Sequence, residues 1–169
     1  MLERQGEGLR AMSAETDRII AQLRADYPDD VDAAGGASAE EVRAAEQRLG
    51  VAFPPSYRTF LGRYGTLGVG SAEIYGITRA DRARGMGTGG VPNAIGVTLR
   101  RRDDAGLSPN LVIVRDLDGD EFVCIDTSTA DERGESPVVR WVVAARSARA
   151  RTADSFDEFL LDTLQSFEP

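Results

Sequence analysis

Residues 38–65 read SAEEVRAAEQRLGVAFPPSYRTFLGRYG and predict two short helices joined at a Pro-Pro corner. Ser38 and Glu41 form the pattern of a capping box, in which each side chain accepts a hydrogen bond from the other residue's backbone N–H. Apolar residues recur at helical spacing in both halves, and a glycine ends each half. We therefore expect a helical corner packed into the core through these structural positions: Leu49, Gly50, Pro54, Pro55, Tyr57, Phe60, Leu61, Tyr64 and Gly65.

The segment before this corner predicts one further helix and a connector. Residues 1–12 show no periodicity and are expected to fray. Residues 13–27 place Ile and Leu on one face of a helix, which should end there because a proline follows. Residues 29–37 contain two glycines and three aspartates and are typical of a flexible connector. We accordingly expect residues 1–37 to form an N-terminal helix and connector, and residues 38–169 to form the main domain.

The segment after the corner predicts an antiparallel sheet and a closing helix. Residues 118–120, Asp-Gly-Asp, separate two β-branched runs and favour a hairpin. Residues 80–93 are expected to be a loop with a short helical turn, and residues 146–154 a connector. A second capping box, Ser155 with Glu158, should open the last helix. The fold class is therefore α+β, with N-terminal helices, a C-terminal helix and a central antiparallel sheet of about five or six strands. Strands are expected over residues 72–77, 94–99, 111–117, 121–126 and 137–145.

Composition excludes several classes of enzyme. The chain has no His, and all 20 of its basic residues are Arg. Ser-His-Asp and Cys-His catalysis, His-ligated zinc and Schiff-base lysine chemistry are therefore excluded, and we expect no enzyme activity and no cofactor. The 28 acidic residues give a formal net charge of −8, which disfavours general nucleic-acid binding and favours a basic protein partner.

Membrane insertion and export are not expected either. The sequence contains no apolar run long enough to cross a bilayer, and its N-terminal residues lack the apolar core of a secretory signal. A single cysteine allows no intrachain disulfide. These features predict a cytoplasmic protein.

Three local motifs resemble functional sites, but each is better interpreted as structure. The acidic run 116–121 resembles the start of a calcium loop, but Thr127 stands where an EF-hand requires glutamate, so a hairpin turn is favoured. The glycine-rich run 85–90 lacks the lysine of a phosphate-binding loop and is expected to be a mobile loop. Cys124 and Trp141 lie in expected strands, and we predict that both are buried in the core. No metal site is expected.

Residues 40–65, EEVRAAEQRLGVAFPPSYRTFLGRYG, resemble the signature of the SUKH superfamily, the SMI/KNR family. Later features follow in the same order, namely the hairpin DLDGDEFVCIDTS, the strand VVRW and the final SFDEFLLDTL. The resemblance covers roughly residues 38–164. It departs from the pattern at residue 64, where Tyr-Gly replaces the usual Asn-Gly. The matching positions are Leu49-Gly50, Pro54 or Pro55, Tyr57, Phe60-Leu61 and Tyr64-Gly65.

This resemblance implies a non-enzymatic binding protein. Bacterial members resemble immunity proteins, which block a cognate polymorphic or contact-dependent toxin, often a nuclease, by direct binding in the cytoplasm. A regulatory scaffold or a small-ligand sensor using the concave sheet is the alternative. We expect a monomer or weak homodimer whose partner is a basic toxin domain, with no direct binding to nucleic acid or membrane. The candidate partner-binding residues are Asp103, Asp104, Asp116, Asp118, Asp120 and Glu121.

Overall fold

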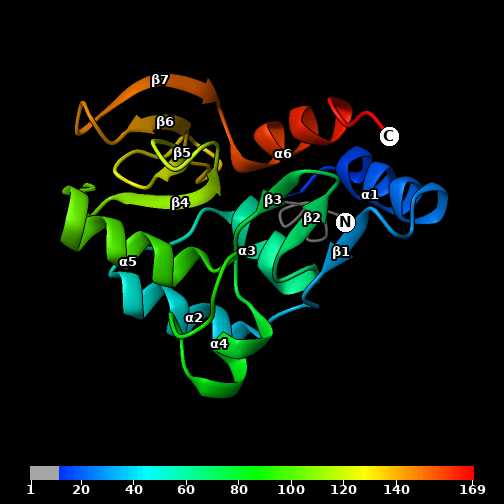
Figure 1. The fold of residues 1–169 in the computed structure, drawn as a ribbon, viewed down its shortest axis with the longest axis horizontal. Helices are drawn as coiled ribbons and strands as arrows, with labels where there is room; N and C mark the ends of the chain where they lie inside the picture. The colour runs from blue at the N-terminus through cyan, green and yellow to red at the C-terminus, as the bar shows by residue number, and fades with distance from the viewer. Residues whose placement is uncertain (1–11) are drawn as a thin grey trace, which may run out of the picture.

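The computed structural model describes residues 12–169 (Figure 1); residues 1–11, which were predicted to fray, lie outside the described residues. Met12, the last residue of that predicted segment, is only 1% exposed and packs in the core. The helices of the described part are α1 (Ala14–Asp26), α2 (Ala39–Leu49), α3 (Pro55–Arg63), α4 (Arg79–Arg84), α5 (Ala94–Ala105) and α6 (Phe156–Gln165). Its strands are β1 (Val31–Ala33), β2 (Leu67–Val69), β3 (Ala72–Ile74), β4 (Leu111–Asp116), β5 (Glu121–Asp126), β6 (Val138–Val142) and β7 (Ser147–Ala153).

The predicted α+β class with a C-terminal helix is confirmed, and the strands divide into two antiparallel sheets. One sheet has the order β1-β2-β3 and the other β4-β5-β6-β7. A hydrogen bond of 2.7 Å from the Tyr75 backbone N–H to the Val114 carbonyl joins them just after β3. In Figure 1, α5 runs along the larger sheet with α2 beneath it, while α6 returns beside β7 toward α1.

The α2–α3 corner forms as predicted. The Ser38 hydroxyl accepts from the Glu41 backbone N–H at 3.1 Å, and the Glu41 carboxylate accepts from the Ser38 N–H at 2.8 Å. Gly50 caps the end of α2, and Pro55 is the first residue of α3, where its missing N–H costs nothing. The apolar faces of both helices are buried, so this corner is part of the core and not an exposed surface.

Tyr57 connects the corner to both sheets. Its ring is completely buried and lies against the aromatic rings of Phe53, Phe60 and Phe156. Its hydroxyl donates to the Tyr75 carbonyl at 2.9 Å. The backbone N–H of the same residue, Tyr75, makes the hydrogen bond that joins the two sheets. Burial, reinforced by the negative charge of Asp81, raises the pKa of Tyr57 well above its usual range, so this hydroxyl remains a donor.

Two glycines allow the backbones at this junction to approach closely. A Cβ on Gly76 would lie 1.8 Å from the Gly65 carbonyl oxygen, and one on Gly65 would lie 2.4 Å from the Gly35 oxygen. Gly65 also has φ +71°, a conformation that costs glycine little. The Gly65 carbonyl accepts from the Ile77 N–H at 2.9 Å. The glycine that ends the predicted signature is therefore required by packing as well as by helix termination.

A residue far away in the sequence caps the start of α3. Pro54 supplies no side-chain cap. Instead Glu135 accepts from the Ser56 backbone N–H at 2.9 Å and from the Ser56 hydroxyl at 2.6 Å. A carboxylate at this end also complements the positive end of the helix dipole. The loop before β6 is thereby fixed against the corner.

The strand predicted at residues 94–99 is wrong, because this segment is the first half of α5. The Asn93 side-chain oxygen caps the helix by accepting from the backbone N–H groups of Ile95 and Gly96 at 3.0 and 3.1 Å. Ile95 and Thr98 are buried on one face, and the Thr98 hydroxyl accepts from the Ile113 N–H at 2.9 Å. This buried cap and the contact with β4 favour a helix over the local β-branched pattern.

Two predicted connectors contain strands. Residues 29–37 include β1, which pairs with β2, and residues 146–154 include β7, which pairs with β6. Neither shows a strong apolar alternation, since β1 has three residues and β7 is a largely exposed edge strand. The short β2 was also not predicted. The domain boundary at residue 37 stays a prediction.

Other local predictions are confirmed. The 111–126 hairpin forms, and Cys124 and Trp141 are buried. The helical turn predicted within residues 80–93 is the short helix α4, which begins one residue earlier, at Arg79. The Ser155 hydroxyl caps α6 by accepting from the Glu158 backbone N–H. The Glu158 carboxylate accepts from the backbone N–H of Asp154 and not from that of Ser155, so only half of the predicted capping box is present.

The first prediction concerns the Tyr57 hydroxyl. Tyr57→Phe leaves the buried Tyr75 carbonyl without this donor, so the free energy of unfolding should fall by about 1–3 kcal/mol. Urea denaturation measures the effect as a lower transition midpoint, with the same m-value for the parent and the variant. Tyr27→Phe is the control, because the Tyr27 hydroxyl makes no hydrogen bond to residues 12–169. Equal, small effects of both substitutions would contradict the assigned role.

The second prediction concerns the pH dependence of the Glu135 cap. Burial raises the pKa of this carboxyl, and the two bonds from Ser56 only partly oppose the shift. The folded chain therefore holds this proton more tightly than the unfolded chain, where the pKa is about 4.3. As pH rises from about 4.3 through the folded pKa, the stability due to Glu135 should fall.

Comparison with Glu135→Gln isolates this group, because the other carboxyls titrate in both proteins. The stability of the parent minus that of the variant should shrink with rising pH in denaturation experiments across this window. A difference that grows with pH would mean that the folded pKa is lowered.

Candidate functional site

The predicted acidic residues of the β4–β5 hairpin lie at its turn and are partly used to build it. The Asp118 side chain accepts from the backbone N–H groups of Asp120 and Glu121 at 3.0 and 2.9 Å. Asp116 accepts from the Gly119 N–H at 2.6 Å. Glu121 is paired with Arg140. Asp118 and Asp120 are exposed, so the turn presents a small, rigid acidic tip.

Asp103 and Asp104 are exposed near the end of α5, apart from the turn in sequence. The Arg101 guanidinium forms a salt bridge with the Asp104 carboxylate at 3.5 Å. The same guanidinium lies over the Phe122 ring, with its central carbon 5.1 Å from the ring centre. A cation therefore lies between Asp104 and the strand that follows the turn. The six predicted residues thus come from two places, the end of α5 and the β4–β5 hairpin, and their role in binding stays a prediction.

A larger acidic feature lies on the three-stranded sheet. A groove of about 530 Å³ runs between this sheet and the segment that follows α4. The strand register places Asp32 and Glu73 on either side of Gly68, so the two carboxylates share one face with no side chain between them. Four exposed carboxylates line the groove: Asp29, Asp30, Asp32 and Glu73.

The four carboxylates of this groove form no ion pair within the described part of the chain. The one arginine that lines the groove, Arg79, donates instead to the Ala34 carbonyl at 3.0 Å. Val91, 63% exposed, supplies an apolar side chain on the opposite wall. The groove thus combines fixed negative charge with an uncovered apolar residue.

The walls of the groove are held by hydrogen bonds. Arg82 donates to the Gly36 and Ala34 carbonyls at 2.8 and 2.7 Å, which fixes the chain after β1 against α4. On the other wall, buried Asp81 accepts from the Gly87 N–H and from the Asn93 side chain, each at 2.8 Å. The glycine-rich loop that was predicted to be mobile is therefore tied to this buried carboxylate. These hydrogen bonds hold both walls of the groove in place.

The sequence contained one signal for this groove, the acidic run at residues 29–32. It was not recognised because the segment was interpreted as a connector. Glu73 gave no signal, since its position opposite Asp32 follows from pairing between distant strands. No comparable signal marked Val91.

The described residues show little that supports catalysis. Cys124 is fully buried, and burial raises the pKa of its thiol, which disfavours the reactive thiolate. Residues 12–169 contain no group of three or more Cys, Asp or Glu placed to hold a metal ion. No helix among them is both long and apolar enough to cross a bilayer. What the groove offers chemically is charge and shape for a cationic partner.

Comparisons with known proteins agree with this fold. A SUKH family model, described as SMI1-KNR4 cell-wall, matches residues 16–165. A crystal structure of a protein from Pseudomonas syringae pv. tomato is similar, with a TM-score of 0.60 and 17% sequence identity. The similarity covers 89% of this chain and 99% of that one. At this identity the likeness shows a shared fold.

The third prediction tests the charge of the groove with a fluorescent oligoarginine peptide. Asp32→Asn/Glu73→Gln should weaken binding at low salt by about fivefold, because two unpaired charges are removed from one concave surface. Asp118→Asn/Asp120→Asn changes the net charge equally and should have a smaller effect. Fluorescence anisotropy at two salt concentrations measures both. An equal or greater loss in the hairpin variant would favour the turn as the main cationic site.

Proposed function

This chain belongs to the SMI1-KNR4 cell-wall family of the SUKH superfamily, and we propose that it is a cytoplasmic immunity protein that neutralises a toxin domain by direct binding. The observation that carries the proposal is the acidic groove, in which four carboxylates face solvent and form no ion pair with residues 12–169. The proposed role as an immunity protein comes from the resemblance of residues 40–65 to the SUKH signature, which bacterial immunity proteins share.

The charge of the groove favours a basic partner. The formal net charge of −8 attracts a cationic surface over a distance, and the groove concentrates that field on one face. A toxin domain that acts on nucleic acid must itself present a cationic surface to phosphate. An acidic groove that occupied this surface would compete with the substrate, so one contact would give both recognition and inhibition.

The apolar wall adds contact area to this electrostatic attraction. Val91 precedes Pro92 at the edge of the groove, and both residues line it. An exposed apolar side chain beside charged residues can be buried by a partner, which slows dissociation. The acidic tip at Asp118 and Asp120 is a second place where a basic partner can contact the chain.

The fourth prediction is a test in cells. If a gene beside that of this chain encodes a candidate toxin domain, co-expression of the chain with that domain should restore growth, and the two proteins should co-purify. Asp32→Asn/Glu73→Gln should weaken both rescue and complex formation, whereas Asp118→Asn/Asp120→Asn should weaken them less. Absence of rescue and of a complex would remove the immunity function. Rescue without a complex would exclude neutralisation by direct binding.

A further inference from the structure

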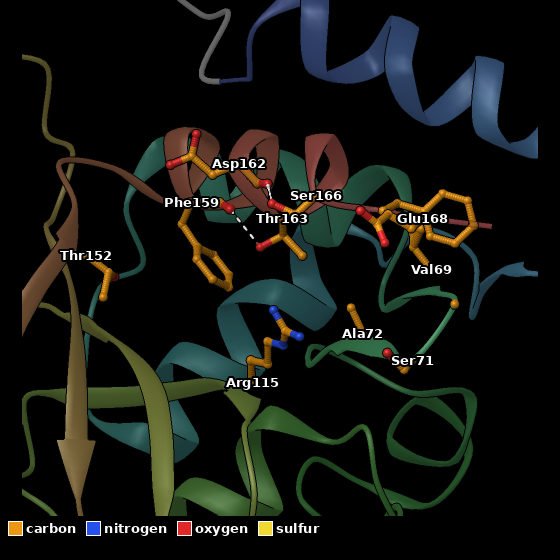
Figure 2. Close-up of a pocket in the computed structure, with 12 residues that line it drawn as sticks. Val69, Ser71, Ala72, Arg115, Thr152, Phe159, Asp162, Thr163, Ser166 and Glu168 are labelled. Carbon is orange, nitrogen blue, oxygen red and sulfur yellow. Dashed lines mark hydrogen bonds between the residues drawn. The ribbon is translucent and has the colours of Figure 1, made fainter.

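A second groove, of about 440 Å³, lies between α6 and the β2–β3 hairpin. Figure 2 shows the guanidinium of Arg115 in this groove, with α6 above it and Ser71 and Ala72 beside it. Thr152 on β7 and Phe159 on α6 line the same space. The groove therefore combines residues from both sheets and the closing helix around one cation.

A β-bulge places Arg115 in this position. The register of β4 against β5 shifts between Ile113 and Arg115, and Val114 uses its carbonyl to accept the bond from Tyr75. Such a bulge changes the direction of the following side chain. The same feature that joins the two sheets thus directs Arg115 toward α6.

Arg115 is half-buried and makes no side-chain hydrogen bond or salt bridge with residues 12–169. The guanidinium has five donors in a planar fork that matches a carboxylate. Two acidic residues, Asp162 and Glu168, line the same groove, and neither pairs with Arg115. In Figure 2 the Asp162 carboxylate points away from Arg115, while Glu168 lies on the opposite side of the groove.

The remaining lining is mixed in a way that suits a small amphipathic molecule. Phe159 and Phe167 supply aromatic surface, and Val69 and Ala72 supply aliphatic surface. The Thr163 hydroxyl donates to the Phe159 carbonyl at 2.9 Å and keeps its lone pairs for a ligand donor. Apolar surface and polar groups of fixed position thus line one groove, and a ligand with both an apolar and a charged part can contact both.

We propose that this groove binds a small zwitterion, an apolar α-amino acid or a short peptide of such residues, through Arg115 and Glu168. The ligand carboxylate pairs with the Arg115 guanidinium, the ammonium group lies toward Glu168, and the side chain packs on Phe159. A cation and an anion at opposite sides of one groove select a ligand that carries both charges. The proposal does not rest on the immunity function.

The test uses ligands that each lack one charge. L-Leucine, N-acetyl-L-leucine and L-leucinamide are titrated into the full chain, and binding is followed by amide chemical shifts. L-Leucine should bind, and the two derivatives should bind about tenfold more weakly, since each loses one charge-assisted contact. Shifted amides should lie in β3, β4 and α6. Failure of all three to shift these amides, or leucinamide binding as tightly as leucine, would overturn the proposal.

Substitutions assign the two ends of the site. Arg115→Gln should lower the affinity for both L-leucine and N-acetyl-L-leucine by about tenfold. Glu168→Gln should weaken the binding of L-leucine but should not weaken that of N-acetyl-L-leucine, which has no ammonium group. Arg133→Gln, at an exposed residue outside this groove, is the matched control. An affinity for L-leucine that Glu168→Gln leaves unchanged would overturn the zwitterion assignment, because the ammonium group would then have no partner at Glu168. If the Arg115→Gln variant does not fold, the comparison of L-leucine with its two derivatives on the unmodified chain still tests whether the site binds a zwitterion.

Discussion

The hydrogen bond from the Tyr57 hydroxyl to the Tyr75 carbonyl is the constraint on which the rest of the structure depends. Tyr75 also donates its N–H to Val114, so one residue connects the helical corner, the small sheet and the large sheet. A buried carbonyl without a donor is costly, and no solvent reaches Tyr57 to replace it. Close approach of Gly65 and Gly76 is what brings these backbones within reach of each other.

Both grooves follow from this junction. The acidic groove lies on the face of the sheet that β1, β2 and β3 form, and the central strand of that sheet, β2, follows directly after the corner. The arginine groove lies on the side where β4 bulges to meet Tyr75. The buried corner contributes none of the groove carboxylates, so the residues that line the groove can change while the corner keeps its packing.

The sequence predicted the elements whose signals are local. The Ser38 capping box, the Pro54-Pro55 corner and the Asp-Gly hairpin depend on residues a few positions apart, and each forms. The helix α5 was mistaken for a strand because its cap, Asn93, is held by a buried contact with Asp81 that no local pattern shows. The groove residues were missed because Asp32 and Glu73 meet only through β2.

The central claim is that a basic partner binds on the three-stranded sheet. Hydrogen exchange of the chain, alone and in complex with the toxin domain whose growth inhibition it relieves, measures this directly. The account predicts slower amide exchange in the complex over residues 29–34 and 66–74, where the acidic groove lies. Protection confined to the β4–β5 turn or to the α2–α3 corner, with residues 29–34 unchanged, would contradict it.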